Sequence, residues 1–156
     1  AGFAHVAHAP EGLAQLLVSS QPFVACVPAA HALARRRALP LTALAGEPLA
    51  LVSRSVSPDY HARIVGACQA AGFTPQPLHE LQHWLSVVSL VAQGLAVALV
   101  PAALQQAALA GAAFVPVKDP HGALPRYETR CLWNPERDLP ALGLFLAQVR
   151  EVAQAG

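Results

Sequence analysis

A change of period at a single glycine, inside the apolar segment 81–102, constrains the fold of this chain more than any other feature. Before Gly94 the apolar residues recur at helical spacing, at Trp84, Leu85, Val88, Val91 and Ala92. Glycine favours the left-handed conformation that ends a helix. The run from Leu95 to Val100 is continuously apolar and stops at Pro101, which is typical of a strand buried on both faces in a parallel sheet. A helix followed by such a strand predicts an α/β fold.

The same segment raises the alternative of a membrane-spanning helix, which needs about 20 predominantly apolar residues. Polar residues and glycine interrupt it, at His83, Ser86, Ser89, Gln93 and Gly94. No basic cluster flanks it, and the chain does not open with the charged and apolar regions of a secretion signal. We therefore expect a cytoplasmic protein with no membrane contact.

The charge balance gives no sign of a nucleic-acid partner for this chain. Its 10 Lys and Arg residues face 9 Asp and Glu residues, for a formal net charge of +1. Binding through bulk charge requires a clear basic excess. The run Arg35, Arg36 and Arg37 is short, and a solvated loop explains it better than nucleic-acid binding does. The 156 residues fit one domain with a sizeable core.

Cysteine usage indicates a reducing compartment. Cys26, Cys68 and Cys131 are odd in number and far apart in the sequence, so we expect buried free thiols and no disulfide framework. The chain contains no methionine, not even at position 1, and we expect it to be a fragment of a longer protein.

Other elements alternate along the chain. Strands are predicted for residues 23–27, 48–52, 76–81, 113–117 and 127–133, a helical turn for 41–44, and a short helix for 102–110. A helix over 57–72 has the clearest limits, with Ser57 as cap, Pro58 at its first position and Gly72 at its end. Its predicted buried face is Tyr60, Ile64, Ala67, Cys68 and Ala71. A last helix, capped by Asp138, is expected to bury Leu142, Phe145, Leu146, Val149 and Val152.

Three segments in order carry a resemblance to a known family: QPFVACVPAAHALA (21–34), LTALAGEPLALVSRSVSP (41–58) and LQHWLSVVSLVAQGLAVALVPAAL (81–104). Together they resemble the effector-binding domain of LysR-type bacterial transcriptional regulators, and the resemblance spans most of the chain. The chain departs from the family pattern at Ala32, where proline is common, and at Ala96, where a second glycine is common.

The resemblance implies a fold like that of periplasmic binding proteins, with two Rossmann-like α/β subdomains joined by crossing strands and a ligand in the cleft between them. Residues 28–111 would form the second, inserted subdomain, and 1–27 with 112–156 would belong to an incomplete first subdomain. It implies a sensor that is not an enzyme, with a small organic effector such as a carboxylate or aromatic acid. DNA would be contacted only through an N-terminal helix-turn-helix absent from this chain, and the full-length protein would form a homodimer or homotetramer.

The expected effector contacts follow the ends of predicted strands, where ligands gather in α/β sheets. They are Ser53, Arg54, Ser55, Val56 and Ser57 before one helix, Gln82, His83 and Trp84 before the next, and Val100 with Pro101. Free N–H groups at a helix start, with serine hydroxyls, suit a carboxylate. The resemblance adds His5, facing the same cleft from the other side. Taken singly, Ser57 is equally explained as a cap, Arg54 as a solvated side chain and Trp84 as core.

No metal or cofactor site is predicted. The sequence lacks a CxxC pair, and His79 and His83 are divided between a strand and a helix start. It also lacks a GxSxG elbow, a GxGxxG turn and a phosphate-binding GxxxxGK[ST] loop. Two alternatives stay open: a solute-binding protein of a transporter, and a small α/β hydrolase.

Overall fold

The structure is a computed structural model that describes residues 1–6, 9–119, 122, 124–137 and 140–155. Its contacts divide the chain into two compact units. The central unit comprises residues 22–125, and the flanking unit comprises 1–21 with 126–156. The predicted inserted subdomain, 28–111, lies wholly within the central unit. Within the described ranges, no helix is long and apolar enough to cross a membrane.

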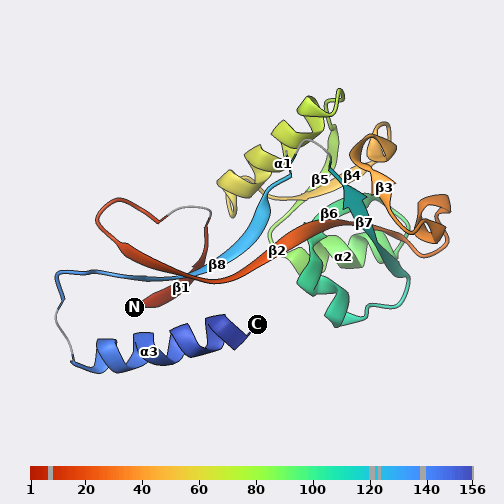
Figure 1. The fold of residues 1–156 in the computed structure, drawn as a ribbon. Coiled ribbons are helices and arrows are strands. Elements are labelled where there is room, and N and C mark those ends of the chain that lie inside the picture. Colours follow the sequence, from red (N-terminus) through yellow and green to blue (C-terminus); the bar gives the residue numbers. More distant parts are fainter. Residues whose placement is uncertain (7–8, 120–121, 123, 138–139, 156) are drawn as a thin grey trace. The chain divides into compact units, whose positions relative to one another are not determined.

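A mixed sheet runs through the central unit (Figure 1). Its strand order is β5 (Pro77–Leu81), β4 (Leu49–Val52), β6 (Val97–Pro101), β2 (Ala14–Pro28), β7 (Ala112–Lys118) and β3 (Leu39–Pro40). The pairs β5–β4, β4–β6 and β7–β3 are parallel, whereas β2 is antiparallel to both β6 and β7. The α/β prediction is confirmed.

Two helices cover the two faces of this sheet (Figure 1). Helix α2 (Trp84–Ala92) packs Val87, Val88 and Val91 against Ala50, Ala98 and Val100. Side chains alternate between the faces of a strand, so the equally buried Leu49, Leu51 and Leu99 point to the opposite face, where helix α1 (Pro58–Ala70) lies. Shorter 3-10 turns complete the unit: η1 (Ala32–Arg35), η2 (Leu41–Leu44) and η3 (Ala102–Ala107).

The predicted change of structure at Gly94 is confirmed. Gly94 has φ +78°, and two hydrogen bonds close α2: the Gly94 N–H donates to the Val91 carbonyl at 2.8 Å, and the Leu95 N–H to the Leu90 carbonyl at 3.4 Å. Strand β6 then begins at Val97. The prediction that Leu95 is a buried strand residue is wrong, because Leu95 lies in the turn and is 54% exposed.

Helix α1 begins at Pro58 and ends before Gly72, as predicted, and Ser57 stands at the N-cap position. Gly72 has φ +93°, and the Phe73 N–H donates to the Cys68 carbonyl, which completes a Schellman ending. The Ser57 side chain, however, makes no capping hydrogen bond, so only the position of the predicted cap is confirmed. The turn before the helix is closed by backbone, because the N–H groups of Val56 and Ser57 both donate to the Ser53 carbonyl.

Two further elements differ from the sequence prediction. The segment after Pro101 is the 3-10 turn η3, which ends at Ala108 with φ +46°, and not a helix to residue 110. Strand β2 begins at Ala14 and not at Phe23. The first half of β2 contains the polar residues Gln15, Ser19 and Ser20 and is only partly buried. It therefore lacks the continuous apolar run that identified the strand at 23–27.

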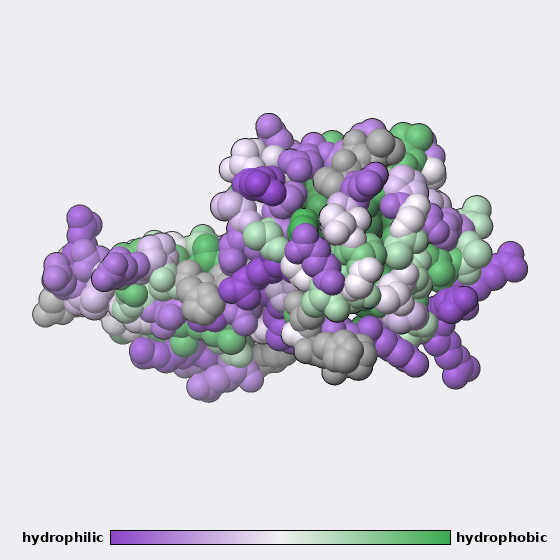
Figure 2. Space-filling model, turned by 90° about the horizontal axis from the view of Figure 1, so that it is seen from above, coloured by the Kyte–Doolittle hydropathy of each residue, from purple (hydrophilic) through white to green (hydrophobic). Residues whose placement is uncertain are grey.

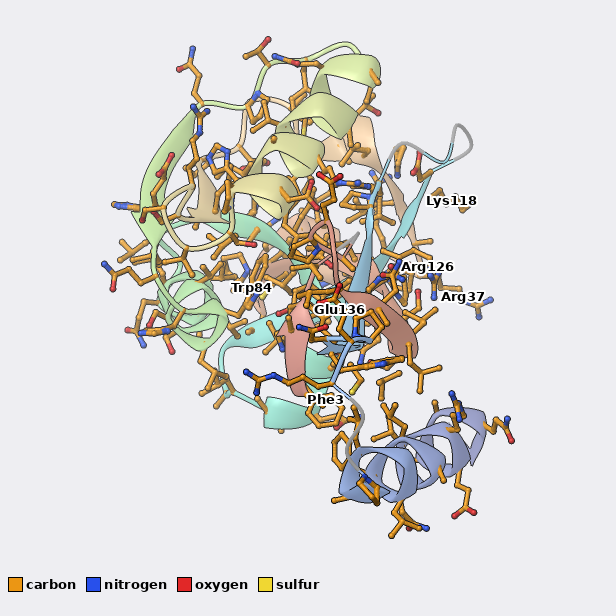
Figure 3. All side chains as sticks on the ribbon, turned by 90° about the vertical axis from the view of Figure 1, so that its left-hand side faces the viewer. Phe3, Arg37, Trp84, Lys118, Arg126 and Glu136 are labelled. Atoms are coloured by element: carbon orange, nitrogen blue, oxygen red, sulfur yellow. The ribbon has the colours of Figure 1, made fainter. Side chains whose placement is uncertain are left out.

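The flanking unit has its own small core. Strand β1 (Gly2–His5) pairs antiparallel with β8 (Arg126–Trp133), and helix α3 (Pro140–Ala155) buries Leu146 and Val149 against Cys131. Phe3 points toward α3, where its ring meets Phe145 edge to face at 6.1 Å (Figure 3). Two residues expected in the buried stripe are exposed: Phe145 is 39% and Val152 is 66% exposed. The predicted cap, Asp138, lies outside the described residues.

The three cysteines are free and buried, as expected. Burial raises the pKa of the Cys26 thiol from 9.0 to about 12 and that of the Cys68 thiol to about 11, because a thiolate loses its hydration in the core. The unfolded chain therefore releases these protons at lower pH than the folded chain does. The contribution of the two protonated thiols to the free energy of unfolding is therefore fully present below about pH 9 and falls as the pH rises above it.

Iodoacetamide is expected to leave Cys26 and Cys68 unmodified in the folded protein at pH 8, since only the thiolate reacts and burial also blocks access. In denaturant both cysteines should be alkylated at the rate of an exposed free thiol. Peptide mass spectrometry of native and denatured samples measures this difference. Equal rates of labelling in the two samples would contradict the buried positions.

Candidate functional site

Three segments that follow strands meet at one edge of the central unit's sheet, which we name the carboxyl edge. Strands β5, β4 and β6 are parallel, so their carboxyl ends point the same way. Val52 pairs with Leu81, and the Ser53 N–H donates to the Leu81 carbonyl at 2.7 Å. The segments 53–57 and 82–84 are thereby joined, and Pro101 ends the third strand at this edge.

The segment 53–57 forms a serine-rich turn before α1. The hydroxyls of Ser53 and Ser55 lie 2.8 Å apart, and the Ser55 N–H donates to the Ser53 hydroxyl at 3.2 Å. One hydroxyl proton serves the pair, so the other O–H group remains a donor for a further partner. Arg54, Ser55 and Val56 are exposed. This turn therefore offers a hydroxyl donor and a guanidinium group to solvent.

An aromatic cluster lies beside the serine-rich turn. Phe23 is 3% exposed, and its ring centre lies 5.9 Å from those of both Tyr60 and Trp84. Tyr60 stands in the first turn of α1. Trp84, labelled in Figure 3, is the first residue of α2. Trp84 is half-buried, whereas Gln82 and His83 are exposed. The edge thus combines an apolar aromatic wall with polar side chains from two helix starts.

Charges near the carboxyl edge leave it suited to an anion. The partial positive charges of the α1 and α2 N-termini lie there. The nearby Asp59 carboxylate accepts from Arg63 Nε at 2.9 Å, and the Glu80 carboxylate accepts from His61 Nε2 at 3.2 Å. Both acidic side chains are thus engaged with basic partners, and Arg54 adds a positive charge.

The structure does not bring every predicted residue to the surface of this edge. Val100 is fully buried and packs with α2, and Pro101 is buried where it pairs with Phe23. Their role as ligand contacts stays a prediction. His5 belongs to the flanking unit, where its ring stacks on Tyr127 at 4.8 Å and its Nδ1 lies 3.2 Å from the Thr129 hydroxyl.

One buried polar side chain, His61, was missed by the sequence reasoning. His61 is 3% exposed and joins α1 to β5 through Glu80, while its Nδ1 has no hydrogen-bond partner among the described residues. A signal existed, because His61, Ile64 and Cys68 share one helical face. In the described part of the chain, no three of its His, Cys, Asp and Glu side chains gather as metal ligands would.

Comparison with known proteins identifies regulators as relatives. A family model for the LysR substrate binding domain matches residues 1–154. The chain is 34% identical over 146 residues to the HTH-type transcriptional regulator IlvR of Caulobacter vibrioides, covering 94% of this chain and 47% of that protein. It is 26% identical over 129 residues to the HTH-type transcriptional regulator BenM of Acinetobacter baylyi, covering 81% of this chain and 42% of BenM.

Solved structures agree on the fold. The BenM effector binding domain with its effector benzoate superposes with a TM-score of 0.79 at 20% identity, covering 99% of this chain and 69% of that one. CbnR, a LysR family transcriptional regulator, gives a TM-score of 0.81 at 20% identity, covering 97% of this chain and 52% of CbnR. The periplasmic-binding-protein-like fold expected from the sequence is confirmed. The chain spans about half the length, or less, of the curated relatives described above. It belongs to the LysR substrate-binding domain family.

Proposed function

We propose that this chain is the ligand-sensing part of a LysR-type transcriptional regulator. Its effector is a small organic carboxylate or aromatic acid, bound at the carboxyl edge. The relatives support this proposal over a transporter's solute-binding protein or a hydrolase, because IlvR and BenM are transcriptional regulators. One structural neighbour binds benzoate as its effector, and CbnR has been solved with its target DNA.

The observation that carries the proposal is the convergence of segments 53–57 and 82–84, joined by the hydrogen bond from Ser53 to Leu81. A carboxylate at this edge receives hydrogen bonds from the Ser55 hydroxyl and the Arg54 guanidinium, and the two helix N-termini stabilise its charge. An aromatic or aliphatic body of the effector packs on the exposed part of Trp84. We retain His5 as a further effector contact only because the family resemblance implies it.

The ligand signal reaches DNA through a change in the populations of two arrangements of the effector-binding units. An effector shifts this equilibrium only if its affinity for the two arrangements differs. DNA contact lies in a helix-turn-helix outside this chain, in a cytoplasmic protein that acts as a homodimer or homotetramer. This chain itself performs no catalysis in the proposed mechanism.

Arg54→Ala and Ser55→Ala are each expected to weaken effector binding by about tenfold, since each removes a hydrogen bond to a charged group worth about 1.5 kcal/mol. Calorimetric titration of the protein as it occurs in the cell, first with a panel of carboxylates, supplies the effector and the reference affinity. The control is Arg37→Ala, which removes an equally exposed arginine elsewhere in the central unit. Unchanged affinity in both site variants would contradict the proposed contacts.

A further inference from the structure

One groove of the central unit lies away from the carboxyl edge. A groove of about 580 Å³ lies at the opposite edge, lined by residues from the segments 44–49 and 73–76. We name it the rear groove. These segments lead into the amino ends of β4 and β5, whereas the proposed effector site follows their carboxyl ends. Its volume is in the range of small-molecule pockets, about 300–1,000 Å³.

The rear groove has an apolar floor and one charged side chain. Leu44 and Leu49 are each 1% exposed and form part of its lining, together with the half-buried Phe73. Among the described residues that line the groove, Glu47 is the only one with a charge. Thr74 and Gln76 add a hydroxyl and an amide carbonyl. The groove therefore presents acceptors above an apolar surface and no cationic side chain.

Two independent features make the rear groove attractive to cations. The first is the Glu47 carboxylate, whose Oε1 lies 3.5 Å from His31 Nε2. A carboxylate has about four acceptor positions, so the contact with His31 orients Glu47 without saturating it. The second is the C-terminus of α1, the end with partial negative charge, because the chain runs from Ala70 through Gly72 directly into the lining segment 73–76.

We propose that the rear groove binds a small organic ammonium ion that carries a short apolar body. The ammonium group donates to Glu47, with Thr74 and Gln76 as further acceptors, and the apolar body lies on Leu44 and Phe73. A carboxylate ligand is disfavoured, because no lining side chain neutralises it. The ligand chemistry is thus opposite in charge to that proposed for the carboxyl edge, and this site does not depend on the proposed effector site.

The test compares three probes of one shape in the protein as it occurs in the cell: 4-fluorobenzylamine, 4-fluorobenzyl alcohol and 4-fluorobenzoate. Fluorine NMR titration follows the binding of each. We expect the ammonium probe to bind about tenfold more tightly than the alcohol, because a charge-assisted hydrogen bond replaces a neutral one. Glu47→Gln should remove this difference, whereas Glu136→Gln, the same change at an exposed glutamate of the flanking unit, should preserve it.

Equal affinity of the amine and the alcohol would overturn the proposal, and so would an undiminished preference in Glu47→Gln. The comparison of probes on the unaltered protein stands even if the Glu47 variant is unstable. Circular dichroism checks that variant, whose fold we expect to persist because a partly exposed pair such as His31–Glu47 contributes little to stability. Binding of 4-fluorobenzoate that responds to Arg54→Ala but not to Glu47→Gln reports on the carboxyl edge and separates the two sites.

Discussion

Gly111→Ala is expected to lower the free energy of unfolding by about 2–4 kcal/mol. Gly111 has φ +91°, a conformation that costs a side chain about 1–2 kcal/mol. An added Cβ would also lie 2.7 Å from the Ala92 carbonyl oxygen, closer than real Cβ contacts. The backbone at Gly111 cannot easily shift to relieve this close contact, because the Gly111 carbonyl accepts a hydrogen bond from the Ala29 N–H at 2.8 Å.

The matched control for this variant is Gly66→Ala, the same change with the opposite expected sign. Gly66 is exposed within α1, and a Cβ there would meet nothing within 4 Å. Alanine is expected to stabilise the protein by about 0.5–1 kcal/mol, because it restricts the unfolded chain and favours helix. Urea unfolding followed by circular dichroism measures both variants. A neutral Gly111→Ala would contradict the close approach of Gly111 to α2.

Phe23→Ala is also expected to have a large effect and to lower the free energy of unfolding by about 3–5 kcal/mol. Phe23 is 3% exposed and stands between Tyr60 and Trp84, so its removal leaves a cavity that the sheet and two helices cannot easily close. The same change should move the fluorescence emission of Trp84 to longer wavelength, because water gains access to the indole.

Phe3→Ala supplies the comparison for Phe23. Phe3 is 58% exposed and meets only the edge of Phe145 among the ring contacts described, so its loss should cost less than about 1.5 kcal/mol. Urea unfolding of the two variants gives their difference directly. Similar losses for both would contradict the burial of Phe23, and an unchanged Trp84 emission in Phe23→Ala would contradict the aromatic cluster.

Elements with strong local signals could be predicted from the sequence. At Gly72 and at Gly94 a helical apolar pattern stops, and each glycine adopts the left-handed conformation that ends a helix. The predicted ends of α1 and α2 are therefore confirmed. The parallel order of β5, β4 and β6 follows from the same helix and strand alternation. The carboxyl edge, with Ser53 to Ser57 and Gln82 to Trp84 near each other, could therefore be anticipated before the structure.

Features that depend on long-range contacts could not be predicted. The pairing of Val52 with Leu81, which joins the serine-rich turn to the start of α2, links residues 29 positions apart in the sequence. The burial of Val100 follows from the apolar run that it ends, but its contact with α2 is seen only once the sheet is assembled. The rear groove joins residues 44–49 to residues 73–76, and no local pattern relates Glu47 to Phe73.

The central claim, effector binding at the carboxyl edge, is tested most directly by hydrogen–deuterium exchange of the whole protein with and without the tightest-binding carboxylate from the calorimetric panel. A ligand that accepts hydrogen bonds from these segments slows the opening of their backbone amides. The predicted result is protection of peptides that cover residues 53–57 and 82–86, with no change at 44–49 or 73–76. Protection of the rear-groove peptides, with the carboxyl edge unchanged, would contradict the account.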